Sequence, residues 1–352
     1  MKHQNKAILF YICAITLFCF FLGYASLQNK TIESWLAYWD VKNSLEILKT
    51  YFLGKITNIN LFLYALDKDG NIINTLKEPD ELKQIIEFLR KNNIKISVTF
   101  TNDVIYSQND KRLKDSGIVN KILSDDSLRQ KHIKQILEIS RSINADGVDI
   151  DYESININDK DIFTQFIEEL SFALHNDKKN LIVTVQQKTE NHQRTGAGAI
   201  DWREISRYAD KIIIMCYNYS SKVSGPGPIC PIYWLKDIIR FAKTQIPLDK
   251  ICIALPLHGY DWSKEGINSI NLQKVEKLFL DYPLEKRWDK KSQSPYFRYS
   301  KGGVKHEVWF EDKESLSEKI QIIKNYHINN IALWHVGILD PSLSDTLQDF
   351  LN

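Results

Sequence analysis

The strongest constraint on the fold is a repeated alternation of short apolar runs with amphipathic helical patterns from residue 34 onward. The runs are rich in Ile, Val and aromatic residues and are mostly apolar at both parities, which is typical of strands covered on both faces. We predict eight strands, at Trp35–Trp39, Ile59–Ala65, Ile94–Thr101, Gly147–Tyr152, Leu181–Gln186, Lys211–Tyr217, Ile251–Leu255 and Asn330–Trp334.

Between these runs, apolar residues recur at helical spacing, as they do after the helix start at Pro79–Glu81. Strands that alternate with helices indicate a parallel sheet, and eight units in a chain of 352 residues favour a closed (β/α)8 TIM barrel. A doubly wound open sheet is the alternative, but no G-x-G-x-x-G sequence follows an early strand. Further helices are predicted at Ser124–Ile143, Asp161–His175, Tyr233–Thr244 and Ser315–Tyr326.

One connection is much longer than the others. About seventy residues separate Leu255 from Asn330, where a helix and its loops need only about twenty. Within it, Tyr296–Glu311 has the pattern of two strands joined by a turn at Lys301-Gly302-Gly303, which indicates a hairpin. We therefore predict a small α+β insertion between strands seven and eight, at about residues 258–312.

The N-terminus has the pattern of an export segment. Lys2 and Lys6 precede the uncharged apolar run Ala7–Ala25, and the next charged residue is Lys30. Such a run is either a cleaved signal peptide or a retained membrane anchor, since nineteen helical residues reach about 28 Å. We predict an exported protein, secreted or anchored to the membrane and facing outward, with residues 31–352 as one barrel unit.

Composition excludes some partners and sites. The net charge is +2, so the sequence does not indicate a nucleic-acid partner. Beyond the apolar N-terminal run the cysteines are Cys216, Cys230 and Cys252, without the spacing of a zinc site. A bridge between Cys216 and Cys252, on neighbouring predicted strands, is conceivable, but three buried thiols are favoured. We predict no metal and no cofactor.

An acidic row interrupts the fourth predicted strand. Asp149, Asp151 and Glu153 stand at i, i+2 and i+4 and share one face, successive residues about 6.5–7 Å apart. In a barrel this face points into the lumen, with Glu153 at the C-terminal rim where active sites form. Converging carboxyls share protons, so one of them can stay protonated and act as a general acid. A solvated turn and a hard-cation site are the alternatives.

These residues carry a resemblance to a known family. The segment Asp146–Glu153 is similar to the D-G-x-D-x-D-x-E signature of glycoside hydrolase family 18, the chitinase superfamily. Met215–Asn218 resembles the family's M-x-Y-[DEN] segment, and Trp334 stands where the family has a tryptophan on strand eight. The segments MCYNYSSKVSGPGPICPIYWLKDII, ALPLHGYDW, HEVWFEDKESLSEKI and NNIALWHVGILDP resemble the spore-cortex-lytic branch, which cleaves N-acetylglucosamine linkages in peptidoglycan.

The resemblance, which covers residues 34–351, implies a retaining mechanism without a protein nucleophile, in which the 2-acetamido group of the substrate attacks the anomeric carbon. It implies that Glu153 is the acid and base, that Asp151 holds the acetamido N–H and that Asp149 shares a proton with Asp151. It further implies that Tyr217 donates a hydrogen bond to the acetamido carbonyl and that Trp334 lies beneath the sugar. Core packing is the alternative for Tyr217 and Trp334.

Other polar and aromatic residues stand at predicted rim positions. Asn102 follows strand three and Gln186 ends strand five, so both are candidates for substrate hydrogen bonds. Asn218 replaces the Asp of typical family members, and Trp39 at the first rim is a candidate for sugar stacking, with core packing as the alternative.

The sequence thus predicts a monomeric glycosidase acting on a β-linked N-acetylglucosamine polysaccharide, with peptidoglycan favoured. A chitinase or chitooligosaccharide hydrolase remains an alternative. A barrel that binds glycans without cleaving them is another, because a fold does not by itself confer a reaction. Non-catalytic family members usually lose the terminal Glu of the signature, which this chain keeps.

Overall fold

The computed structural model describes residues 30–76, 78, 80–107 and 110–352. The chain divides into two units, Met1–Lys30 and Thr31–Asn352, and all helices and strands named below belong to the second unit. The predicted export segment, Ala7–Ala25, lies outside the described residues. Within the described residues, no helix combines the length and the apolar character that crossing a membrane requires.

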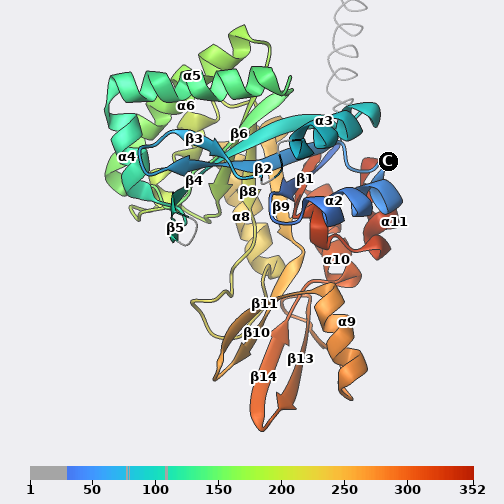
Figure 1. Ribbon diagram of the computed structural model, residues 1–352. Coiled ribbons are helices and arrows are strands. Elements are labelled where there is room, and N and C mark those ends of the chain that lie inside the picture. Colours follow the sequence, from blue (N-terminus) through green and yellow to red (C-terminus); the bar gives the residue numbers. More distant parts are fainter. Residues whose placement is uncertain (1–29, 77, 79, 108–109) are drawn as a thin grey trace, which may run out of the picture. The chain divides into compact units, whose positions relative to one another are not determined.

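Eight parallel strands form a closed barrel, which confirms the predicted (β/α)8 architecture (Figure 1). The ring closes because β1 pairs with both β2 and β15, while β2 also pairs with β4. Around the ring the strands are β1 (Thr31–Ala37), β2 (Asn58–Asp67), β4 (Lys95–Ser107), β6 (Gly147–Asp151), β7 (Asn180–Gln186), β8 (Lys211–Met215), β9 (Ile251–Pro256) and β15 (Asn330–Trp334). Two short antiparallel strands extend the sheet, β3 (Ile72–Asn74) beside β2 and β5 (Asp110–Arg112) beside β4.

Helices surround the barrel (Figure 1). The predicted helix Ser124–Ile143 is confirmed as α5, which begins at Asp126 because Asp125 has an extended backbone and caps the helix by accepting the Leu128 N–H; a separate helix, α4, ends at Ser124. The helices are α2 (Val41–Ile47), continued by a π-helical turn at Leu48–Phe52, α3 (Glu81–Lys91), α4 (Ser116–Ser124), α5 (Asp126–Ser142), α6 (Lys160–Asn176), α7 (Trp202–Ile205), α8 (Ile232–Gln245), α10 (Lys313–Asn325) and α11 (Ser344–Leu351).

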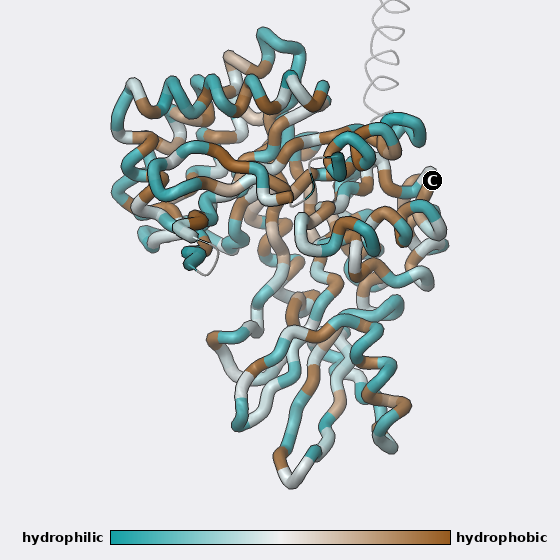
Figure 2. Tube along the Cα trace, in the orientation of Figure 1, coloured by the Kyte–Doolittle hydropathy of each residue, from teal (hydrophilic) through white to brown (hydrophobic). Residues whose placement is uncertain are grey.

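The strands alternate their side chains between the helices and the lumen, as expected for a pleated backbone. In β6, Val148 and Ile150 are fully buried in the main apolar core. Tyr152 continues this face, stacks on Phe166 of α6 and contacts His132 of α5 through its hydroxyl at 2.5 Å. Figure 2 shows the hydrophobic residues concentrated on the barrel strands and the hydrophilic ones on the outer helices.

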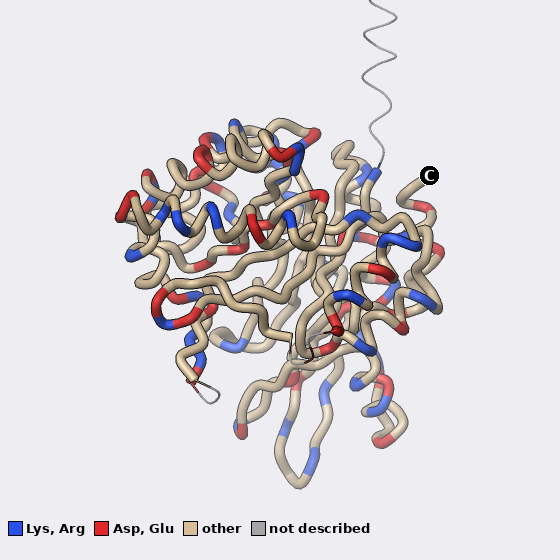
Figure 3. Tube along the Cα trace, turned by 45° about the horizontal axis from the view of Figure 1, so that its top comes forward, with Lys and Arg blue, Asp and Glu red and all other residues tan. Residues whose placement is uncertain are grey.

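Polar groups fill the lumen near the N-terminal ends of the strands. Glu33 of β1 is fully buried and forms an ion pair with Lys211 of β8. Asn60 of β2 donates a hydrogen bond from Nδ2 to Glu33 Oε2 at 3.1 Å. On the outer helices, charged residues of both signs are interspersed (Figure 3).

The predicted insertion after the seventh barrel strand is confirmed. It is an antiparallel sheet in the order β11-β10-β14-β13-β12, with one helix beside it (Figure 1). The predicted hairpin turn has Gly302 and Gly303 at positive φ, +57° and +79°, which residues with a side chain rarely adopt. The elements are β10 (His258–Ser263), β11 (Gly266–Asn271), α9 (Leu272–Asp281), β12 (Arg287–Asp289), β13 (Ser294–Lys301) and β14 (Val304–Trp309).

Candidate active site

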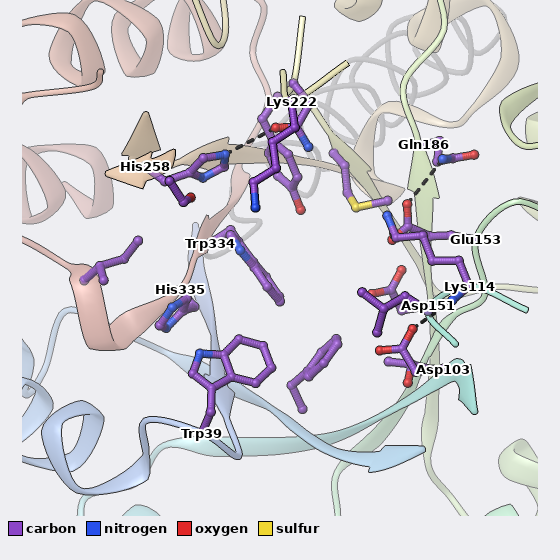
Figure 4. Close-up of a pocket in the computed structure, with 18 of the residues that line it drawn as sticks. Trp39, Asp103, Lys114, Asp151, Glu153, Gln186, Lys222, His258, Trp334 and His335 are labelled. Carbon is purple, nitrogen blue, oxygen red and sulfur yellow. Dashed lines mark hydrogen bonds and ion pairs between the residues drawn. The ribbon is translucent and has the colours of Figure 1, made fainter. Parts of the chain in front are cut away.

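A cleft of about 720 Å³ lies at the C-terminal ends of the barrel strands. It is lined by the residues that end β6, β8 and β15 and by those that follow β1, together with Ser269–Asn271 at the edge of the inserted sheet. Figure 4 shows part of this lining. This is the end of the barrel where catalytic residues are found in enzymes of this architecture. The cleft therefore contains the candidate site.

Asp149 is the deepest carboxyl of the acidic row and is fully buried. Its Oδ2 accepts hydrogen bonds from Trp35 Nε1 at 3.2 Å and Thr99 Oγ1 at 2.8 Å, and its Oδ1 accepts one from Thr184 Oγ1 at 2.7 Å. Burial raises the pKa of Asp149 to about 6, while the three hydrogen bonds oppose that rise by favouring the carboxylate.

Asp151 lies one step closer to the cleft and is nearly buried. Its Oδ1 has no hydrogen-bond partner among the described residues. Burial raises the pKa of Asp151 well above its usual range, and the charges of Glu153 and Asp149 raise it further. Asp149 has three hydrogen-bond donors that favour its carboxylate, whereas Asp151 has an unpartnered oxygen, so of the two carboxyls Asp151 has the environment that favours the protonated acid more.

Glu153 follows the end of β6, at the rim of the cleft. Its main chain is held by Asn102, whose Nδ2 donates to Glu153 O at 2.8 Å and whose Oδ1 accepts the Glu153 N–H at 2.9 Å. The next residue, Ser154, has φ +57°, which turns the chain away from the strand direction. The Glu153 carboxyl points into the cleft with 13% of its side chain exposed.

Asn102 lines the cleft, and both polar atoms of its amide contact the main chain of Glu153, which holds that residue in place. A hydrogen bond from Asn102 to the substrate stays a prediction. The sequence does not reveal the contact between Asn102 and Glu153. It predicts that the strand ends at Thr101, whereas β4 continues to Ser107, so Asn102 lies within the strand. Gln186 ends β7 as predicted, and its Nε2 lies 3.3 Å from Glu153 Oε2.

Tyr217 and Asn218 follow β8 and line the cleft. Burial raises the pKa of Tyr217 well above its usual range, and the charges of Asp151 and Glu153 add to that rise. The Tyr217 hydroxyl therefore stays protonated and can donate a hydrogen bond. Asn218 adopts φ +63°, and its Oδ1 accepts a hydrogen bond from the Tyr260 hydroxyl at 2.9 Å.

Aromatic rings form one side of the cleft (Figure 4). Trp334, the last residue of β15, lies 5.3 Å from the ring of Phe62, 5.5 Å from Trp35 and 6.3 Å from Trp39, centroid to centroid. Trp39 is 52% exposed. It lies beyond the end of β1, because this strand ends at Ala37 and not at Trp39 as predicted. These rings offer apolar surface on which a sugar can stack.

The sequence patterns do not identify several other residues that line the cleft, among them Lys114, His258, Tyr260 and His335. His258 and Tyr260 lie in the ALPLHGYDW segment, so the resemblance is the signal that could have found them. Burial lowers the pKa values of His258 and His335 to about 4, so both rings are neutral near pH 7. Lys114 lies in the loop before α4 and belongs to none of the motifs.

No group of three or more His, Cys, Asp or Glu side chains in the described part of the chain is arranged to hold a metal ion. Cys216, Cys230 and Cys252 are buried free thiols. The conceivable bridge between Cys216 and Cys252 is therefore not formed, and the favoured interpretation of three buried thiols is confirmed.

A barrel that presents a carboxyl row beside aromatic rings at the C-terminal ends of its strands has the features of a carbohydrate-cleaving site. The family model for glycosyl hydrolases family 18 matches residues 23–338, and the chain belongs to this family.

Curated relatives and solved structures support this assignment. The chain is 30% identical over 292 residues to YdhD of Bacillus subtilis, provisionally named a sporulation-specific glycosylase, covering 80% of this chain and 66% of YdhD. It is 27% identical over 293 residues to the cortical fragment-lytic enzyme of Bacillus anthracis, covering 81% of this chain and 66% of that enzyme. The chain thus spans about two thirds of the length of these relatives. The crystal structure of the Bacillus cereus spore cortex-lytic enzyme SleL has the same fold, with a TM-score of 0.81 at 24% identity over 93% of this chain and 76% of SleL.

Proposed function

We propose that this protein cleaves β-linked N-acetylglucosamine glycans with retention of configuration, using the 2-acetamido group of the substrate as the nucleophile, and that peptidoglycan is its preferred substrate. One observation carries the proposal. The row Asp149, Asp151 and Glu153 opens into the same cleft as Tyr217 and Trp334, so an acid, a hydrogen-bond acceptor, a donor and an apolar surface line one cavity.

In the first step the sugar lies against Trp334 with its acetamido group toward Asp151 and Tyr217. Glu153 donates its proton to the glycosidic oxygen, and the bond from that oxygen to C1 breaks. The acetamido carbonyl oxygen forms a bond to C1 from the opposite face, which gives a cyclic oxazolinium ion. No protein side chain bonds to the sugar.

Asp151 and Tyr217 stabilise the acetamido group during this attack. The unpartnered Oδ1 of Asp151 accepts the acetamido N–H, and the Tyr217 hydroxyl donates to the carbonyl oxygen. Movement of the shared proton from Asp151 to Asp149 leaves Asp151 negative as positive charge develops on the acetamido group. Asp149 can receive this proton because its raised pKa, about 6, makes protonation accessible near neutral pH.

In the second step the ionised Glu153 accepts a proton from a water molecule whose oxygen attacks C1. The bond between C1 and the acetamido oxygen breaks, the acetamido group is restored and Glu153 regains its proton. Two successive inversions at C1 give net retention.

Two lines support peptidoglycan over chitin. The relative in Bacillus anthracis is named a cortical fragment-lytic enzyme, and the sequence segments described above resemble the spore-cortex-lytic branch. An export segment at Ala7–Ala25 would place the enzyme outside the cytoplasmic membrane, where peptidoglycan is found. Membrane and culture-medium fractionation of cells that express the full chain tests this location, and recovery in the cytosol alone contradicts it.

The substrate is tested by mass spectrometry of products released from peptidoglycan sacculi and from chitohexaose, in parallel reactions with the wild type and Glu153→Gln. We expect sacculus fragments that end in reducing N-acetylglucosamine, and a large loss of both products in the variant. Release from chitohexaose alone would instead favour a chitinase. Binding to both glycans without any product would favour a non-catalytic barrel.

A further inference from the structure

A lysine contacts the carboxyl group of the proposed acid. Lys114 Nζ lies 2.5 Å from Glu153 Oε1, and 45% of the Lys114 side chain is exposed, against 13% for Glu153 (Figure 4). The ammonium therefore reaches Glu153 from the open side of the cleft. A cation that contacts the acid is not required by the reaction steps described above, so its presence needs a separate explanation.

The loop that carries Lys114 is held in place. Lys114 has φ +58°, and its N–H donates to Asp103 Oδ1 at 2.9 Å. The next residue, Asp115, caps α4 by accepting the N–H groups of Gly117 and Ile118. The backbone is thus fixed while the lysine side chain keeps its flexible stem.

Both oxygens of Glu153 are occupied in this structure, one by Lys114 and the other by Gln186. The glycosidic oxygen must approach this carboxyl to within about 3 Å for proton transfer. We expect Lys114 to yield, because it is the more exposed partner. Its withdrawal frees Glu153 Oε1 for the glycosidic oxygen.

A displaced ammonium is available to another carboxylate that comes within its reach. Among the side chains of the cleft, Asp103 already accepts the Lys114 N–H, and burial raises its pKa, which disfavours its charged form. The environment of Asp151 favours its protonated acid. A carboxylate carried by the substrate is the partner that remains.

Two further cations in the cleft also favour a substrate that carries negative charge. Lys222 and Lys274 line the cavity, both are exposed, and within the described residues neither ammonium forms a hydrogen bond or ion pair. The two histidines of the cleft are neutral near pH 7, as their lowered pKa values show. A neutral chitin chain offers these lysines no counter-charge.

We propose that Lys114 is a specificity residue that binds the lactyl carboxylate of a muramyl residue on the leaving-group side of the bond being cleaved. This inference rests on the proposed function. When N-acetylglucosamine is linked to O4 of N-acetylmuramic acid, the glycosidic oxygen is that O4, and the lactyl ether is on the neighbouring O3. A group that contacts Glu153 is therefore within reach of the lactyl carboxylate when Glu153 contacts the glycosidic oxygen.

The lactyl carboxylate is free only where no peptide is attached to it. A preference for the free carboxylate places this enzyme after an amide hydrolase that removes the peptide stem from the glycan. Such an order means that strands already stripped of peptide are its preferred substrates.

The test compares three tetrasaccharides of alternating N-acetylglucosamine and N-acetylmuramic acid. One has free lactyl carboxylates, one has lactyl carboxamides and one carries peptide stems. The full chain and the variants Lys114→Met, Lys114→Arg and Lys83→Met are assayed on each for kcat/KM. Lys83 is a matched control, because it is an exposed lysine on α3 whose ion-pair partner is Glu87.

We expect the wild type and Lys83→Met to prefer the free acid over the carboxamide and the peptide-bearing glycan by about tenfold, since each tenfold corresponds to about 1.4 kcal/mol of differential binding. In Lys114→Met the ratio of kcat/KM on the free acid to that on the carboxamide should fall to about one. In Lys114→Arg most of the wild-type preference for the free acid should remain. Added salt should reduce the wild-type preference, because an exposed ion pair is screened.

The inference is overturned if the wild type cleaves the free acid and the carboxamide at equal rates, a result that does not depend on whether Lys114→Met folds. It is also overturned if Lys114→Met keeps the wild-type ratio of kcat/KM between the free acid and the carboxamide. In both cases cleavage of these glycans leaves the proposed function standing. Failure of the wild type to cleave any of the three contradicts the peptidoglycan assignment and this inference with it.

Discussion

The two ends of the barrel lumen hold buried carboxyl groups in different electrostatic settings. At the N-terminal end, Glu33 is paired with Lys211 and also accepts a hydrogen bond from Asn60. At the C-terminal end, burial raises the pKa values of Asp149 and Asp151; the charges of Glu153 and Asp149 raise that of Asp151 further, and the charge of Glu33 adds to the rise at Asp149. The first arrangement pairs opposite charges, whereas the second buries neighbouring carboxyls whose raised pKa values suit them to acid–base chemistry.

The largest expected effect is at the C-terminal end. Glu153→Gln keeps the size of the side chain but removes the transferable proton, so kcat should fall by about 10²- to 10⁴-fold. Unfolding in urea should differ from the wild type by less than about 1 kcal/mol. Steady-state kinetics on a chromogenic N-acetylglucosaminide measures the loss, and near wild-type turnover would remove Glu153 from the acid role.

At the other end, Glu33→Gln should act on stability instead. The change leaves the Lys211 ammonium without its partner in the lumen, and breaking a buried ion pair costs about 3–5 kcal/mol. The double variant Glu33→Gln/Lys211→Met should recover most of this loss, because no buried charge remains. The folded fraction of either variant should keep most of the wild-type kcat, because Glu33 acts on the acidic row only through the minor effect of its charge on the pKa of Asp149. A large loss of kcat in well-folded protein would show that the two ends are not independent.

A smaller effect is expected from Tyr217→Phe, which removes the donor to the acetamido carbonyl. We expect kcat to fall by about 100-fold with little change in KM, since the hydrogen bond strengthens as charge develops on the carbonyl oxygen. Tyr260→Phe is the matched control, because it removes only the hydroxyl that donates to Asn218. Equal losses in the two variants would argue against a direct role of Tyr217.

The smallest effect is on the pH dependence of stability. Asp149 has a pKa of about 6 in the folded protein, above the usual value of about 4 for an unfolded Asp. Between pH 4 and 6 the folded protein keeps a proton that the unfolded chain releases, so the free energy of unfolding falls as the pH rises through this window. In Asp149→Asn this fall should shrink by roughly 1–3 kcal/mol in urea titrations at several pH values. An unchanged pH profile would mean that Asp149 does not bind a proton between pH 4 and 6 in the folded protein.

The contrast between the two ends also shows what the sequence can predict. Asp149, Asp151 and Glu153 are recognisable because three acidic residues at alternating positions stand out in an apolar strand. Glu33 and Lys211 are 178 residues apart and belong to different strands, so no local pattern reveals their ion pair. Pairing across a barrel depends on strand register, which short apolar runs do not define.

The same limit applies to Asn102 and Lys114. The sequence places Asn102 at a rim but cannot tell that its amide holds the Glu153 main chain, because that contact joins residues 51 positions apart. Lys114 reaches Glu153 because β4 runs on past its predicted end and returns through β5 to a residue at positive φ. A lysine in a polar loop resembles any solvated charge until the fold places it beside the acid.

The central claim is that the acetamido group of the substrate is the nucleophile, and a series of substrates tests it directly. Aryl N-acetylglucosaminides whose acetyl group carries none, one, two or three fluorine atoms have progressively less nucleophilic carbonyl oxygens. We expect kcat to fall steeply along the series, by more than tenfold from the first to the last. A flat response would contradict the account, because it would mean that the carbonyl oxygen does not bond to C1 in the rate-limiting step.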